Sequence, residues 1–114
     1  DAAALARMRA GAILVNVARG PVVVEKALIA ALASGHLGGA AIDVFDTQPL
    51  PTDHPFLSLP NVILTPHMAG ITEESMLRMG QGVVAEATRV LAGDLPRNLV
   101  NPAAVAKYRS RFPD

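Results

Sequence analysis

Short apolar runs and segments with helical spacing alternate along the chain. The run "AILVNV" (12–17) lies between Gly11 and Gly20, and its brevity and flanking glycines favour a buried strand over a helix. The runs "GAAIDVF" (39–45) and "VILT" (62–65) predict a second and a third strand of the same kind.

Three helices are predicted around these strands. Residues 1–11 suit a short helix capped by Asp1, with Gly11 as its stop. Residues 25–34 and 72–92 carry apolar residues three and four positions apart, which is typical of one helix face. Nearly continuous apolar strands that alternate with helices predict an α/β fold, in which helices cover both faces of a parallel sheet.

The segment 46–61 is the longest connection and contains four prolines. Loops of this length in a compact domain are usually functional or disordered, and the prolines favour a stiff loop with a fixed position. After Gly93 the sequence predicts a crossing to another unit, so we expect one domain segment at 1–97 and a tail at 98–114.

Composition narrows the functional classes. The ten Lys and Arg residues balance ten Asp and Glu residues without a basic run, which argues against nucleic-acid and membrane partners. The chain has no cysteine, so it forms neither a disulfide nor a thiolate metal site, and no apolar run reaches membrane-spanning length. We expect a cytoplasmic protein and, because the chain opens on Asp1 rather than Met, a fragment of a longer one.

Polar residues follow all three predicted strands. Arg19 comes after the first, Asp43 and Gln48 lie at and after the end of the second, and His67 follows the third. Ligands of open parallel sheets bind outside the carboxyl ends of the strands. We therefore predict that these side chains converge on one sheet edge, with Gln48 near His67.

Each residue alone also has a structural interpretation. Arg19 is as readily a salt-bridge partner in a loop, and Asp43 is a candidate helix cap, although a carboxylate in an apolar run needs some partner. A lone histidine after a strand, such as His67, is more often structural than catalytic. His36 and His54 are expected to have structural or solvent roles, and no histidine pair has metal-ligand spacing, so no metal is assigned.

The stretch "GQGVVA" (80–85) matches the glycine fingerprint of dinucleotide-binding proteins. That motif acts as a turn between a strand and a helix, whereas this stretch lies within the predicted helix 72–92. We therefore reject it as a phosphate site.

Three stretches together resemble a known family: "GAILVNVARGPVVVEKALIAAL", "GGAAIDVFDTQPLPTDHPF" and "LPNVILTPHMAGITEES". They are similar to the C-terminal half of the nucleotide-binding domain of the D-isomer-specific 2-hydroxyacid dehydrogenases. The resemblance covers roughly residues 1–100 and implies a partial Rossmann-like parallel sheet flanked by helices. It also implies that the phosphate-binding glycines lie upstream.

The resemblance implies roles for the residues at the predicted edge. Arg19 matches the arginine that holds the substrate carboxylate, a task suited to its bidentate guanidinium. His67 matches the general acid–base, and Gln48 occupies the position of its partner. The residues implied at the cofactor are Val17, Ala18, Arg19, Asp43, His67, Ala69 and Gly70.

The implied protein is an NAD- or NADP-dependent oxidoreductase of small 2-hydroxy or 2-keto acids, a homodimer at full length. Two positions depart from the family pattern: Gln48 replaces a glutamate, and Val24 replaces an aspartate that would cap the helix opening at Glu25. A glutamine orients the histidine ring but supplies no charge to favour the imidazolium.

Three alternatives stay open. Gln48 with the nearby "DHP" resembles the formate dehydrogenase branch, although Ala69 stands where that branch has serine. A nicotinamide-sensing protein like the corepressor branch is a second option, favoured by Gln48 and opposed by the retention of Arg19 and His67. A third is that the piece is inert alone, because it lacks the phosphate loop.

Overall fold

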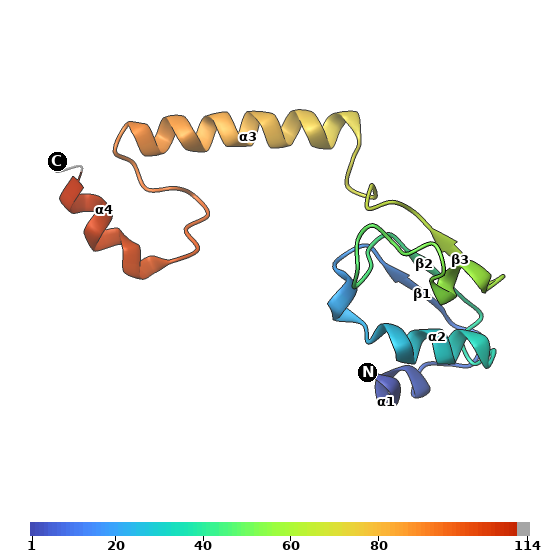
Figure 1. Ribbon diagram of the computed structural model, residues 1–114. Helices are drawn as coiled ribbons and strands as arrows, with labels where there is room; N and C mark the ends of the chain where they lie inside the picture. The colour runs from blue at the N-terminus through green and yellow to red at the C-terminus, as the bar shows by residue number, and fades with distance from the viewer. Residues whose placement is uncertain (112–114) are drawn as a thin grey trace. The chain divides into compact units, whose positions relative to one another are not determined.

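The computed structural model describes residues 1–111. The chain divides into two compact units, Asp1–Gly70 and Ile71–Asp114 (Figure 1). The predicted tail 98–114 is therefore described only as far as residue 111, and the predicted boundary between residues 97 and 98 stays a prediction.

The first unit is built on a three-stranded sheet. Strands β1 (Ile13–Asn16), β2 (Gly39–Ile42) and β3 (Val62–Leu64) lie in the order β1-β2-β3, and both neighbouring pairs are parallel. The predicted strands and the Rossmann-like fold class are confirmed. Each strand is shorter than the apolar run that predicts it, although the ladder hydrogen bonds continue to Asp43 and Thr65, which donate their N–H groups to the carbonyls of Asn16 and Ile42.

One face of this sheet is covered by helices α1 (Ala2–Ala6) and α2 (Glu25–Ala33), which pack on each other (Figure 1). Their buried leucines meet side chains from the sheet and from the loop that follows β2. The largest fully buried side chains are Leu28, Leu37, Val44 and Phe56. Aliphatic residues and two phenylalanines thus form the core.

The opposite face of the sheet is apolar and exposed within this unit. Ile13, Val15 and Ile63 are 70%, 63% and 68% exposed. Successive side chains of a strand point to opposite faces, so these residues alternate with the buried ones. The expectation of a sheet covered on both faces is not met within residues 1–70.

The start of α1 follows the sequence prediction, whereas its end does not. Asp1 caps α1 as predicted, accepting a hydrogen bond from the N–H of Ala4 at 2.9 Å. The helix ends at Ala6 and not at Gly11, because the segment after it turns to meet the residues before β2. Gly11 donates its N–H to the carbonyl of His36 at 2.8 Å and adopts a φ of 80°, a conformation that suits glycine.

The second unit contains the long helix α3 (Glu73–Leu91), followed by η3 (Pro102–Ala104) and α4 (Val105–Arg111). Thr72 caps α3 in a reciprocal capping box with Ser75, and Gly93 follows its end with a φ of 89°. The glycine motif at 80–85 lies within α3, which confirms its rejection as a phosphate turn. Within residues 1–111, no helix is long and apolar enough to cross a membrane.

Candidate active site at the carboxyl edge of the sheet

The polar residues singled out above collect at one edge of the sheet. Because all three strands are parallel, their carboxyl ends share that edge. Asp43 directly follows β2, whereas Arg19 and His67 each follow their strand by three residues. The predicted common edge is confirmed.

Asn16 shapes the turn that carries Arg19. Its side chain is buried and accepts a hydrogen bond from the N–H of Ala18 at 3.1 Å, while its amide group donates to the carbonyl of Arg19 at 3.0 Å. The Arg19 side chain is exposed and donates to the carbonyl of Ala18 at 2.6 Å. The turn is thus fixed by a buried amide, while the guanidinium lies at the surface.

Gly20 brings this turn against the end of β2. A Cβ at Gly20 would lie 2.3 Å from the carbonyl carbon and oxygen of Phe45, and 2.6 Å from the N atom of Asp46. Only glycine permits so close a backbone approach. The Arg19 turn and the start of the loop 46–61 are therefore in direct contact.

Asp43 fastens the turn after β3 to the end of β2. Its carboxylate is 3% exposed and accepts hydrogen bonds from the Thr65 hydroxyl and from the N–H groups of Met68 and Ala69, both at 2.9 Å. The Thr65 hydrogen bond is the main cause that lowers the pKa of Asp43; burial opposes it, and the two N–H groups and His67 add to it. Because its partners lie in a turn, Asp43 is not the helix cap considered from the sequence.

His67 has a left-handed backbone conformation, with a φ of 60°. Such a conformation is uncommon for residues other than glycine and requires support from the surroundings. Asp43 supplies that support, since its partners Thr65, Met68 and Ala69 lie on both sides of His67. A left-handed residue braced in this way directs its side chain away from the path of the strand.

Gln48 contacts His67 directly. The Nδ1 atom of His67 lies 2.9 Å from Oε1 of Gln48, while Nε2 of Gln48 donates to the carbonyl of Phe45 at 3.3 Å. The second bond turns the amide so that its oxygen faces the ring, and His67 therefore carries its proton on Nδ1. The predicted proximity of Gln48 to His67 is confirmed, and Gln48 contacts the ring through Nδ1 rather than Nε2.

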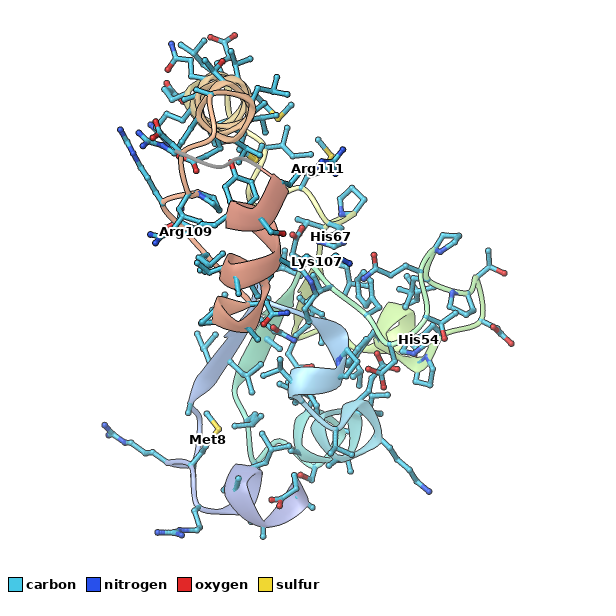
Figure 2. The ribbon with its side chains drawn as sticks, turned by 90° about the vertical axis from the view of Figure 1, so that its left-hand side faces the viewer. Met8, His54, His67, Lys107, Arg109 and Arg111 are labelled. Atoms are coloured by element: carbon cyan, nitrogen blue, oxygen red, sulfur yellow. The ribbon has the colours of Figure 1, made fainter. Side chains whose placement is uncertain are left out.

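The other two histidines each contact a residue that is distant in the sequence. The Nε2 atom of His36 lies 3.1 Å from the carbonyl oxygen of Leu5, which links α1 to the segment before β2. His54 belongs to the proline-containing loop (Figure 2). Its Nε2 lies 2.9 Å from a carboxylate oxygen of Glu25.

A hollow of about 310 Å³ lies beside the Gln48–His67 pair. Its walls are mostly apolar and come from the loop 46–61 and the end of β3; the lining residues include Pro49, Leu50, Leu57, Leu64 and Pro66. An apolar wall beside a reactive imidazole lowers the local polarity around any group bound there. Among residues 1–111, no cluster of three potential ligands for a metal ion occurs.

Two residues at this edge were not predicted from the sequence. Asn16 is the single polar residue in "AILVNV", and Thr65 ends "VILT". A polar side chain in an apolar run is the sequence signal that could have identified both residues. Both hold functional turns through hydrogen bonds. Their partners, however, depend on how the turns fold back.

A parallel sheet with an arginine, a buried carboxylate and an oriented histidine at its carboxyl edge is typical of part of a nucleotide-binding domain. The family model of the D-isomer specific 2-hydroxyacid dehydrogenase NAD-binding domain matches residues 1–69. The chain belongs to this family.

Individual relatives agree with the family match. The chain is 48% identical over 101 residues to glyoxylate/hydroxypyruvate reductase B of Citrobacter koseri, covering 89% of this chain and 31% of the reductase. A D-isomer specific 2-hydroxyacid dehydrogenase from Xanthobacter autotrophicus, solved with NADPH, is 44% identical with a TM-score of 0.79, over 90% of this chain and 42% of that one. The NAD-dependent formate dehydrogenase of Staphylococcus aureus is 40% identical with a TM-score of 0.75, over 86% and 30%. The chain thus spans about a third of the length of the curated reductase.

The edge fits the nicotinamide end of a dinucleotide. Oδ2 of Asp43 accepts from the N–H of Ala69, and a carboxylate oxygen has a second lone pair that suits a carboxamide N–H. A Cβ at Gly70 would meet no atom within 4 Å, so space is present beside this turn.

Proposed function

We propose that this chain supplies the catalytic edge of an NAD(P)-dependent oxidoreductase that interconverts small 2-hydroxy and 2-keto acids. The observation that carries the proposal is the Gln48–His67 pair, held on a turn that Asp43 braces. Family membership and the similarity to reductases and dehydrogenases of these acids support it.

In this proposal Arg19 binds the substrate carboxylate and fixes the direction of the adjacent carbonyl. Among residues 1–111, its exposed guanidinium is hydrogen-bonded only to the carbonyl of the preceding residue, at 2.6 Å, and a carboxylate can replace that bond. The chemistry that a dinucleotide would supply here is hydride donation in reduction and hydride acceptance in oxidation. Val17 and Ala18, beside Arg19, and Ala69 and Gly70, beside the His67 turn, are proposed as walls of the nicotinamide site.

His67 transfers the proton that the reaction requires. In reduction, Nε2–H donates a proton to the oxygen that becomes a hydroxyl; in oxidation, neutral Nε2 accepts it. Gln48 accepts from Nδ1 in both states, so the ring keeps one orientation through the cycle. Asp43 is proposed to bind the carboxamide of the nicotinamide while it braces the turn.

Formate oxidation is a second candidate, and Gln48 is the observation that favours it. Removal of a hydride from formate yields carbon dioxide and requires no proton transfer at an oxygen. A histidine that is oriented by a neutral amide then serves to bind the substrate. The 40% identity to a formate dehydrogenase structure supports this option.

Turnover by the complete enzyme tests the proposal. We expect reduction of glyoxylate or hydroxypyruvate with NADH or NADPH, and no oxidation of formate. Formate oxidation without reduction of a keto acid would establish the second candidate. Dinucleotide binding without turnover of either substrate would establish a sensor of the corepressor kind and contradict both enzymes.

From the family resemblance we also infer that the complete protein is a cytoplasmic homodimer without a nucleic-acid or membrane partner. Light scattering on the complete protein would give its mass directly, and a monomer at micromolar concentration would contradict the homodimer.

A further inference from the structure

Gln48 lies on the long loop 46–61, yet the position of its side chain must be defined closely to orient His67. The loop contains only one short regular element, η2 (Pro55–Ser58), and the Gln48 side chain is exposed. An unrestrained loop of this length samples many conformations, and fixing each residue has an entropic cost. Some other contact must therefore hold the segment that contains Gln48.

Glu25, in the first turn of α2, makes that contact at two points. Its Oε2 accepts from the backbone N–H of Asp46 at 3.3 Å, and its Oε1 lies 2.9 Å from Nε2 of His54. Asp46 precedes Gln48 by two residues and His54 follows it by six, so one carboxylate fastens the loop on both sides of Gln48. The side chains of Glu25 and His54 are 18% and 13% exposed, which limits competition from water.

His54 is itself anchored to the core. Its Nδ1 accepts from the N–H of Phe56 at 3.3 Å, and its ring lies against the Phe56 ring with the centroids 5.0 Å apart. Phe56 is 2% exposed and belongs to the core of the first unit. Because Nδ1 is an acceptor, Nε2 carries the proton and donates it to Glu25.

We propose that Glu25 and His54 form a clamp that positions Gln48 against His67. Neither residue touches the reacting atoms; both are positioning residues, and this role rests on the proposed function. The physical reason is geometric. Because the loop is hydrogen-bonded to Glu25 of α2 on both sides of Gln48, it samples fewer conformations, and the amide of Gln48 stays against the His67 ring.

If Glu25 only stabilised the fold, its substitution would affect His67 differently. Glu25 also suits the N-terminus of α2 by its charge, and Val24 supplies no side-chain cap there. Loss of that effect would lower stability but would leave the protonated nitrogen of His67 unchanged. The tautomer of His67 therefore separates positioning from stabilisation.

Nitrogen-15 NMR of the 114-residue chain reads that tautomer directly. At about pH 9, where imidazoles are generally neutral, the wild type should show His67 protonated on Nδ1. His54→Asn keeps an acceptor for the N–H of Phe56 but is too short to reach Glu25, so the clamp is lost while the turn at η2 is kept. We expect His67 to shift toward a mixture of both tautomers in His54→Asn and in Glu25→Ala.

His36→Asn is the matched control, because His36 is likewise half-buried and bonded to a distant carbonyl. It should leave the His67 signals unchanged. Unchanged His67 signals in folded His54→Asn and Glu25→Ala would overturn the clamp, and so would an equal change in His36→Asn.

Kinetics of the complete enzyme give the second readout. We expect His54→Asn to lower kcat for reduction by about tenfold with little change in KM, because Arg19 still binds the carboxylate. In a Gln48→Ala background the same substitution should have no further effect on kcat. An equal loss in both backgrounds would refute positioning through Gln48. An enzyme inactive on keto acids would refute the proposed function, while the NMR result would still decide the clamp.

Discussion

His67 has an uncommon backbone conformation, and two sets of hydrogen bonds fix its position. The bonds of Asp43 to Thr65, Met68 and Ala69 fix the turn, and the bond to Gln48 fixes the ring. The first set involves a charge that is buried, the second a neutral amide that is exposed. Substitutions at Asp43 and Gln48 should therefore have separable consequences.

Replacing Gln48 with Glu should alter the pH dependence of the complete enzyme. A carboxylate beside Nδ1 favours the charged ring, so reduction should persist to higher pH, with the limb of kcat/KM moved up by about one unit at most. Oxidation near neutral pH should slow, because less neutral His67 is available as a base. Paired pH profiles of the two proteins give the answer; coincident limbs would mean that the residue at 48 does not contact His67.

Replacing Asp43 with Asn should change how the stability of the chain depends on pH. The folded pKa of Asp43 is lowered, chiefly by the Thr65 hydroxyl, so its contribution is complete above the ordinary value of 3.8 and is lost as the pH falls through the lowered pKa. The advantage of the wild type over Asp43→Asn should be full at about pH 7 and should shrink below about pH 4.

Urea unfolding at several pH values measures this difference. Asp53→Asn, an exposed carboxylate in the loop, serves as the control and should match the wild type throughout. A difference between wild type and Asp43→Asn that stays constant across the acid range would show that the charge of Asp43 plays no part.

At the scale of elements, the site depends on turns that meet one another after the strands end. β1, β2 and β3 contribute few side chains to it, and their parallel order brings the three turns to one edge. Gly20 is the point where two of these turns touch, because its Cα faces the backbone of Phe45 and Asp46.

Gly20→Ala should therefore destabilise the first unit and displace the Arg19 turn. The added methyl would lie 2.3 Å from backbone atoms, which cannot move as a flexible side chain can. Overpacking of this kind typically costs about 1–3 kcal/mol. Chemical denaturation checks the loss, with Gly70→Ala as the control, since a Cβ there meets no atom within 4 Å. Equal stability of the two variants would contradict the close approach.

At the scale of the whole molecule, the described chain contains the proposed catalytic edge but not a phosphate-binding turn. Within residues 1–111, the connections after β1 and β3 each hold a single glycine, and β2 is followed by the long loop. Dinucleotide-binding folds obtain much of their affinity from a glycine-rich turn and the helix N-terminus beside it.

The 114-residue chain should consequently bind NADH and NADPH weakly, with a dissociation constant of about 1 mM or higher. Isothermal titration calorimetry of the chain measures this, and the complete enzyme is the comparison that should bind more tightly. A micromolar dissociation constant for the chain would contradict the inference that residues outside the chain supply most of the dinucleotide affinity.

The sequence alone was sufficient to predict the three strands, their parallel order and the residues that follow them. Apolar runs bounded by glycine carry that information locally, and parallel strands necessarily end at one edge. The same local signals predicted the cap at Asp1. These signals overestimated the length of the first helix, because its end depends on a contact between Gly11 and His36.

The sequence predicted that Gln48 lies near His67, but only the tertiary structure decided which of their atoms meet and which groups bind Asp43 and Glu25. The partners of Asp43 are 22 to 26 residues away, Gln48 and His67 are 19 apart, and Glu25 and His54 are 29 apart. A residue pattern is one-dimensional, whereas these bonds form where separate turns fold back onto one another. The sequence thus determined that a histidine lies at the sheet edge, and the fold determined which of its nitrogens contacts Gln48.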